Sequence, residues 1–125
     1  MTRDTPKTTL KMKCIWMLML PLCTSLNTPA NAVEIKNIDK YKIYIHLKVI
    51  TDKEYKCINN LWTNENRLWD PYAKNKKSSA YGIPQLLNLK ERNPYVQMDL
   101  GYKYITHRYK SACNAWSYWL RKGHY

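Results

Sequence analysis

Residues 51–65 read TDKEYKCINNLWTNE and predict an amphipathic helix. Thr51 and Glu54 form the S/T-x-x-E pattern of a capping box, which begins a helix because its side chains satisfy free N–H groups of the first turn. Apolar residues then recur at the spacing of one helical face, the face expected to pack into a core. These residues are Tyr55, Ile58, Leu61 and Trp62. The helix is expected to end at the WDP sequence of residues 69–71, because the residue before a proline avoids helical geometry.

Glu65 continues the apolar face near the end of this helix, three residues after Trp62. Partial burial raises the pKa of a carboxyl group, because the charged form loses its hydration. A carboxyl group that stays protonated near neutral pH can donate its proton to a leaving-group oxygen. Glu65 is therefore the candidate catalytic acid. From the pattern alone, a solvated glutamate at a helix end is the simpler interpretation.

The chain upstream of this helix is ambiguous, because residues 35–50 fit two periodicities. Alternate apolar residues predict a strand, and apolar residues three or four apart predict a helix. The alternating set is Tyr41, Ile43, Ile45, Leu47 and Val49, and the helical set is Tyr41, Tyr44, Ile45 and Val49. We favour the helix.

Downstream, residues 70–84 are rich in polar residues and predict a loop, and residues 85–89 are expected to start a further helix or turn. Asn93 followed by Pro94 is typical of a helix start and predicts a helix over about 94–109. The side chains expected to face inward are Val96, Leu100, Tyr104 and Ile105.

A last helix is expected to begin after Ser111, which can cap it, and to end at Gly123. Its apolar residues are Ala112, Trp116, Trp119 and Leu120. The chain downstream of residue 33 is thus expected to be mostly helical.

The first 32 residues have the organisation of a secretory signal peptide. A basic start precedes the short apolar stretch 14–23, and Ala30-Asn31-Ala32 gives a small-x-small cleavage pattern. The apolar stretch is too short for a stable membrane-spanning helix. We therefore expect a domain of residues 33–125 that is exported to the periplasm or cell wall. The alternative is an N-terminal membrane anchor that is not cleaved.

The expected export determines which cysteines can pair. Cys57 and Cys113 are the two that follow the expected cleavage point. An even pair in an oxidising compartment predicts one disulfide, with two free thiols as the alternative. No metal site is expected, because the three histidines lack ligand spacing. They are His46, His107 and His124.

The charge is strongly positive, with 21 Lys and Arg against 9 Asp and Glu and a formal net charge of +12. Such a charge attracts anionic wall polymers or membrane surfaces without specifying the partner. Nucleic acid would fit the charge equally well, but it fits a signal peptide poorly, so we expect no nucleic-acid partner.

Three ordered segments resemble the catalytic-domain motifs of small lysozyme-like lytic transglycosylases. Residues 61–65 (LWTNE) and 69–75 (WDPYAKN) are similar to the family's Leu-Trp-x-x-Glu-Ser followed by Trp, Pro and Ala-x-Asn. Residues 78–86 (SSAYGIPQL) are similar to Ser-x-Ala-x-Gly-x-x-Gln, and residues 97–109 (QMDLGYKYITHRY) to Gly-x-x-Tyr-Ile-x-x-Arg-Tyr. The resemblance covers about residues 57–125.

This resemblance implies a mainly α, lysozyme-like domain of reduced size that cleaves peptidoglycan between N-acetylmuramic acid and N-acetylglucosamine. Glu65 would be the single general acid/base, and attack by the muramic 6-hydroxyl would leave a 1,6-anhydro end without any cofactor. A monomer acting on glycan strands is expected. The resemblance leaves open whether it serves a conjugation apparatus, a secretion system or a phage.

The resemblance also implies roles around the cleft. Ser79 would hydrogen-bond Glu65 or the substrate, and Gly82 would let the backbone approach the sugar. Gln85 would contact the glycan or fix the loop. Tyr104 would lie over the cleft and orient Glu65, with core packing as the alternative. Tyr81 would be a stacking wall or, equally, a core residue.

The sequence departs from the family pattern beside the candidate acid. Asn66 stands where the family has serine, Leu68 resembles an insertion, and the family's Ala-Tyr-Asn sequence is missing from the last motif. Two alternatives therefore remain beside the transglycosylase: a hydrolytic muramidase, and a catalytically weak peptidoglycan-binding accessory. A basic nucleic-acid binder ranks last.

Overall fold

The computed structural model describes the backbone of residues 30–125 and the side chains from residue 37 onward. Residues 1–29, nearly all of the expected signal peptide, lie outside the described residues. The fold is mainly helical, as expected. The elements are α2 (Ala30–Lys48), α3 (Asp52–Glu65), β1 (Ala80–Tyr81), β2 (Leu86–Leu87), α4 (Pro94–Tyr109) and α5 (Ala112–Lys122).

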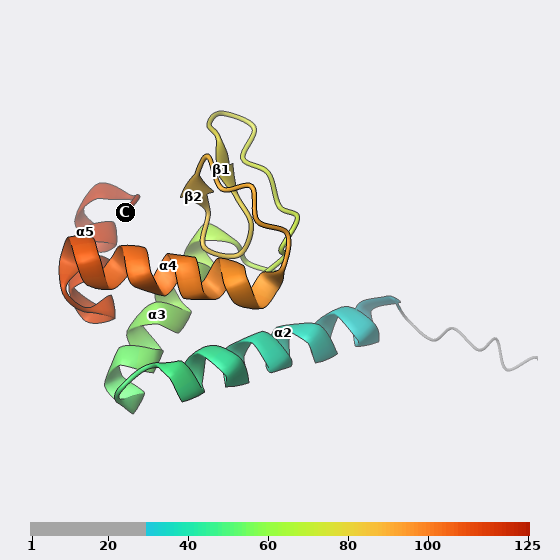
Figure 1. Cartoon of the computed structure of the whole chain (residues 1–125), viewed down its shortest axis with the longest axis horizontal. Helices are drawn as coiled ribbons and strands as arrows, with labels where there is room; N and C mark the ends of the chain where they lie inside the picture. Colours follow the sequence, from blue (N-terminus) through green and yellow to red (C-terminus); the bar gives the residue numbers. More distant parts are fainter. Residues whose placement is uncertain (1–29) are drawn as a thin grey trace, which may run out of the picture.

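The helices pack around α3 and α4 (Figure 1). α3 packs chiefly against α5, while α4 contacts both α5 and α2, and the small β1–β2 hairpin lies on the side of α4 away from α2. Their common core is apolar, and burying it drives folding. The fully buried core residues are Ile45, Ile58, Leu61, Trp62, Trp69, Ile83, Met98, Ile105, Ala112 and Ala115.

The ambiguous upstream segment is helical. α2 places Ile45 in the core, with Tyr41 and Tyr44 partly buried beside it. Val49, the residue directly after α2, is also buried there, as the helical periodicity predicts. Leu47, which belonged to the alternating pattern, is 83% exposed. Packing against α3 and α4 therefore selects the helical interpretation.

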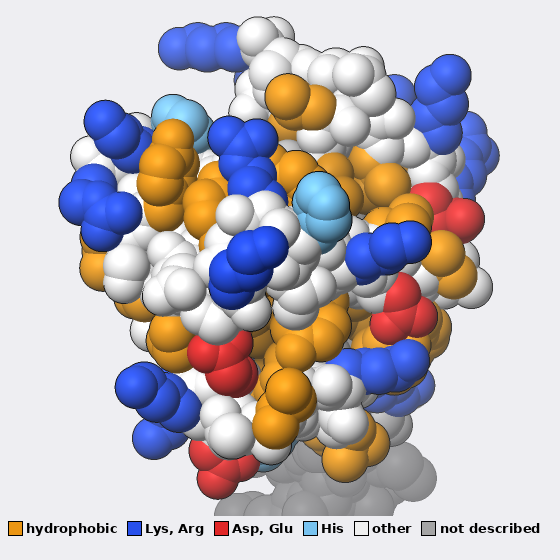
Figure 2. Space-filling view, turned by 60° about the vertical axis from the view of Figure 1, so that its left-hand side comes forward, with side chains coloured by type: hydrophobic (Ala, Val, Ile, Leu, Met, Phe, Trp, Pro, Cys, Tyr) orange, Lys and Arg blue, Asp and Glu red, His pale blue; other side chains and the backbone are white. Residues whose placement is uncertain are grey.

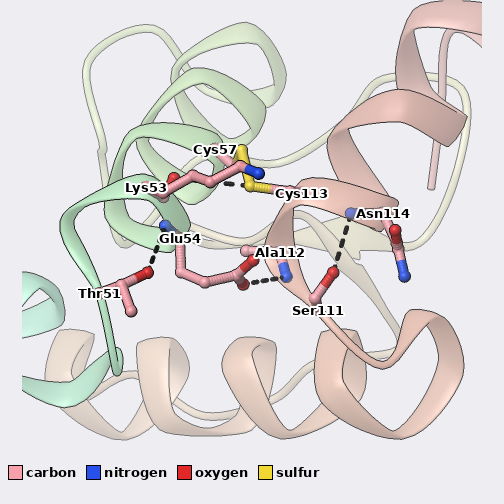
Figure 3. Close-up of a disulfide and its surroundings, with 8 residues drawn as sticks. All are labelled: Thr51, Lys53, Glu54, Cys57, Ser111, Ala112, Cys113 and Asn114. Atoms are coloured by element: carbon pink, nitrogen blue, oxygen red, sulfur yellow. Dashed lines mark hydrogen bonds between the residues drawn. A yellow bond between two sulfur atoms is a disulfide. The ribbon is translucent and has the colours of Figure 1, made fainter.

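The start of α3 uses only half of the expected capping box. Thr51 Oγ1 accepts the N–H of Glu54 at 3.2 Å, as predicted. The Glu54 carboxylate instead accepts the N–H of Ala112, the first residue of α5, at 2.6 Å (Figure 3). Because Glu54 is used in this way, one side chain of α3 satisfies a free N–H at the start of α5.

The predicted disulfide joins the same two helices. Cys57 on α3 and Cys113 on α5 are bonded, and the bond lies next to the contact between Glu54 and Ala112 (Figure 3). Ser111 caps α5 as expected, accepting the N–H of Asn114 at 3.1 Å. The starts of α3 and α5 are therefore connected by both a covalent bond and a hydrogen bond.

α3 ends at Glu65, four residues before the expected stop. Asn66 is extended and 8% exposed, and its side chain binds the loop that follows. Asn66 Nδ2 donates to the carbonyls of Asp70 and Gly82 at 2.8 and 3.1 Å, and Oδ1 accepts the Asp70 N–H at 3.2 Å. These bonds compete with a further helical turn and end the helix.

Of the two expectations for residues 85–89, the helix is wrong, while Gln85 does belong to a turn. Leu86 and Leu87 form β2, which pairs antiparallel with β1. Gln85 has a left-handed φ of 49°, and a residue in that conformation cannot continue a right-handed helix. The turn of residues 82–85, between β1 and β2, reverses the direction of the chain.

The bounds of α4 agree with the prediction and Ile105 is buried as expected, but two of the residues expected to face inward are exposed. Val96 and Leu100 are 38% and 39% exposed, and the buried face is formed by Gln97, Met98, Gly101 and Ile105. A Cβ on Gly101 would lie 2.6 Å from Pro84 Cβ, so the absence of a side chain lets the turn pack there. On α5, Leu120 is 61% exposed, also against expectation.

Candidate active site

Glu65 lies at the C-terminal end of α3 with its carboxyl group half-buried. Its Oε1 accepts the indole N–H of Trp119 on α5 at 2.6 Å. Burial raises the pKa of Glu65 above its ordinary value, while the Trp119 hydrogen bond and the nearby His124 act in the opposite direction. The predicted raised pKa thus has a structural cause.

Two adjoining hollows meet at Glu65. The larger has a volume of about 490 Å³ and the smaller of about 240 Å³, and Glu65 lines both. Asn75 and Gln85 line both, so the hollows form one surface groove past the carboxyl group. The remaining residues of the larger hollow are Asn66, Arg67, Leu68, Asp70, Ala73, Lys74 and Lys76. Those of the smaller are Ser78, Ala80, Leu87, His124 and Tyr125.

Gln85 lies at the centre of this groove and also fixes the loop. Its Nε2 donates to the carbonyls of Ala73 and Gly82 at 3.2 and 2.8 Å. The loop-fixing role implied by the family resemblance thus matches its contacts. Because Gln85 also lines the groove beside Glu65, its expected contact with the glycan stays a proposal.

Gly82 has a role different from the one implied. It is buried and left-handed (φ 75°), and a Cβ there would lie 2.4 Å from Gln97 Oε1. The buried Gln97 amide accepts from the N–H of Ile83 at 3.0 Å and donates to the carbonyls of Pro71 and Glu91 at 2.8 and 2.7 Å. The close approach that glycine permits here is to Gln97, not to the groove.

Ser79 and Tyr81 line a neighbouring hollow of about 230 Å³, which Glu65 does not line. The Ser79 hydroxyl accepts the N–H of Asn88 at 3.2 Å. The structure therefore does not bring Ser79 to Glu65. The serine that lines a hollow with Glu65 is Ser78.

Tyr104 lies at the far end of the groove, where it lines a hollow of about 170 Å³ with Gln85, Leu86, Leu87 and Tyr125. Its ring meets the ring of Tyr125 edge-on, with centroids 5.9 Å apart. The Tyr125 hydroxyl accepts from the Trp62 indole at 3.0 Å and donates to the Pro84 carbonyl. The hydrogen bond that orients Glu65 comes from Trp119 instead.

The sequence did not predict Trp119 as the hydrogen-bond partner of Glu65, nor His124 and Tyr125 as residues that line the groove. Trp119 was expected only as an apolar residue of the last helix. Its partner lies 54 positions away along the chain, and the contact exists because α5 packs against α3. Helical periodicity gives the face of a residue, not its partner on another helix.

Asp70 is the only other acid that lines a groove hollow in the described part of the chain. Its Oδ1 accepts the N–H of Tyr72 at 2.8 Å, which makes it part of a local turn. Within residues 37–125, no three His, Cys, Asp or Glu side chains gather in a way that could hold a metal ion. None of the described helices has both the length and the apolar character for a bilayer crossing.

Comparison of the chain with protein-family models, with curated proteins and with solved structures gives no match. What the protein does is therefore inferred from the geometry around Glu65 and from the motif resemblance.

Proposed function

We propose that this protein is an exported lytic transglycosylase with a reduced lysozyme-like fold, acting on peptidoglycan with Glu65 as its general acid/base. The observation that carries the proposal is the position of Glu65: a half-buried carboxyl group with a raised pKa that lines two adjoining hollows of a surface groove. A groove made of two adjoining hollows that share the acid suits a polymer, because it offers room for more than one sugar beside the cleaved bond.

Trp119 determines which oxygen of Glu65 carries the proton. An indole N–H can only donate, so Oε1 accepts, and because a carbonyl oxygen accepts better than a hydroxyl oxygen, the acid proton is favoured on Oε2. In the first step Oε2 protonates the glycosidic oxygen while the bond from that oxygen to the muramic C1 breaks. In the second, the muramic 6-hydroxyl bonds to C1 and returns its proton to Glu65. The products are a 1,6-anhydro end and a free 4-hydroxyl, and no water is consumed.

Hydrolysis is the second candidate, and the position of Asp70 favours it. Most glycoside hydrolases use two carboxyl groups, one as acid and one as nucleophile or base. Asp70 lines the larger hollow with Glu65. Its carboxylate already accepts from Tyr72, which is why we rank this candidate second.

Mass spectrometry of muropeptides released from purified sacculi tests the proposal. The native protein should release 1,6-anhydro ends, Glu65→Gln should release none, and the matched control Asp39→Asn, at an exposed site on α2, should behave like the native protein. Reducing ends that disappear in Asp70→Asn would establish hydrolysis instead. Binding to sacculi with no released product from the native protein would leave a wall-binding accessory.

A further inference from the structure

The two ends of the groove differ in chemistry. The larger hollow is lined by three cations, Arg67, Lys74 and Lys76, whereas the hollow at the opposite end is lined mainly by leucine and tyrosine side chains. Tyrosine rings suit the apolar faces of sugars. Neutral sugars offer no comparable partner to three cations, so the larger hollow is built for something else.

The three cations are available to a ligand. All three are exposed, and in the part of the chain whose side chains are described no acidic group lies within 4.0 Å of any of them. Two acids share the hollow. Asp70 is engaged by the Tyr72 N–H, and Glu65 has the raised pKa. Three cations against two acids give the hollow an excess of positive charge.

The backbone that bears the two lysines is held in place. Lys74 forms a β-bridge with Tyr81, and the Asn75 N–H donates to the Ala80 carbonyl at 3.0 Å. The Lys77 N–H donates to Asn75 Oδ1 at 2.8 Å, which fixes the turn around Lys76. The cations therefore project from a defined loop that the groove shares with Glu65.

We propose that this hollow, lined by Arg67, Lys74 and Lys76, binds the carboxylates of the stem peptide attached to the glycan. The inference rests on the proposed function and adds that peptide-bearing strands are preferred. A volume of about 490 Å³ exceeds the needs of one carboxylate and lies in the range of sites that hold a short peptide or a drug-sized ligand. Cations in such a site attract carboxylates and discriminate against neutral analogues.

The test compares intact sacculi with the same sacculi after chemical amidation of the peptide carboxylates. The native protein should cleave the intact material about threefold to tenfold more efficiently, as expected for a few solvent-exposed charge pairs. In Lys74→Gln/Lys76→Gln this preference should disappear. In Lys56→Gln/Lys103→Gln, which removes the same charge from exposed sites outside the groove, it should persist. Equal cleavage of both materials by the native protein would overturn the inference while leaving the proposed function intact.

A binding measurement distinguishes failure of the proposed function from failure of the peptide-site inference. Glu65→Gln should co-sediment more strongly with intact than with amidated sacculi, and added salt should reduce the difference. If no protein variant cleaves either material but this difference is present, the proposed function fails and the peptide site stands. The inference is overturned if binding to intact and amidated sacculi is equal, and if Lys74→Gln/Lys76→Gln and Lys56→Gln/Lys103→Gln weaken that binding equally. Such a result would show only the general attraction of a basic protein to the wall. Lys and Arg side chains spread over the face shown in Figure 2 make that control necessary.

Discussion

The indole of Trp119 donates to Oε1 of Glu65 at 2.6 Å and so joins the end of α3 to α5. The bond has two opposing effects. It fixes the direction of the carboxyl group, and it stabilises the charged form, which works against the rise in pKa caused by burial. Trp119 is therefore a positioning residue whose removal should change both the rate and its pH dependence.

Replacing Trp119 with phenylalanine removes the donor and keeps an aromatic ring. We expect the pKa of Glu65 to rise, because the charged carboxyl group loses a hydrogen bond. A general acid works while protonated, so the loss of activity at alkaline pH should move to higher pH. The maximal kcat should also fall by roughly tenfold or more, because the Glu65 carboxyl group is less well oriented toward the substrate.

The matched control is Trp116→Phe. Trp116 stacks on Trp119 with ring centroids 5.3 Å apart, and Glu65 accepts its hydrogen bond from Trp119, not from Trp116. Its kcat–pH profile should keep the native midpoint. Identical midpoints in Trp119→Phe and the native protein would show that the hydrogen bond does not tune the acid.

Glu65→Gln should stabilise the protein at neutral and alkaline pH while abolishing cleavage. The folded-state pKa of Glu65 is raised, so its contribution to stability is present below the unfolded-state pKa and is lost as pH rises through the folded-state pKa. Glutamine stays neutral throughout, and its Oε1 can still accept from Trp119. In urea unfolding, the native protein and Glu65→Gln should have the same free energy of unfolding at acidic pH. As pH rises, the variant should become the more stable of the two. A constant difference at all pH values would contradict this.

Two glycines allow the cost of a backbone conformation to be separated from a steric clash. Gly82 and Gly123 both have φ 75°, but an added Cβ meets Gln97 at Gly82 and nothing within 4 Å at Gly123. Gly123→Ala should cost about 1–2 kcal/mol of unfolding free energy. Gly82→Ala should cost about 1–3 kcal/mol more, because Gln97 must give up buried hydrogen bonds. Equal losses would mean that Gln97 moves aside without cost.

The disulfide should contribute much of the stability of this small domain. Cys57 and Cys113 are 56 positions apart, a separation for which the chain-entropy model gives about 4 kcal/mol. Reduction should lower the urea midpoint of the native protein, and a reducing agent should have no effect on Cys57→Ser/Cys113→Ser. An unchanged midpoint after complete reduction would show that packing of α3 on α5 is sufficient.

Local signals in the sequence predicted much of the fold. The pattern around Thr51, the Asn93-Pro94 start and the Ser111 cap each place a helix start correctly, because capping involves neighbouring residues. The pairing of Cys57 with Cys113 followed from the expected export, because these are the two cysteines after the expected cleavage point. These features need no knowledge of how the helices pack.

Features that depend on distant contacts were not predictable in this way. The inward face of α4 is set by Pro84 and Trp62 packing on Gly101, and neither contact is visible in the spacing of apolar residues. Asn66, which looked like a departure from the motif, forms three hydrogen bonds that end α3 and hold the loop. The donor to Glu65 was missed for the same reason.

The carboxylate of Glu54 has a mechanical consequence. Together with the adjacent disulfide it holds α3 against α5 about two to three turns from Glu65, so Glu65 and Trp119 belong to a single stiff frame. The opposite wall of the groove, in contrast, is a loop fastened by side-chain amides. We expect the loop to move when a glycan chain binds, while the orientation of the Glu65 carboxyl group stays constant.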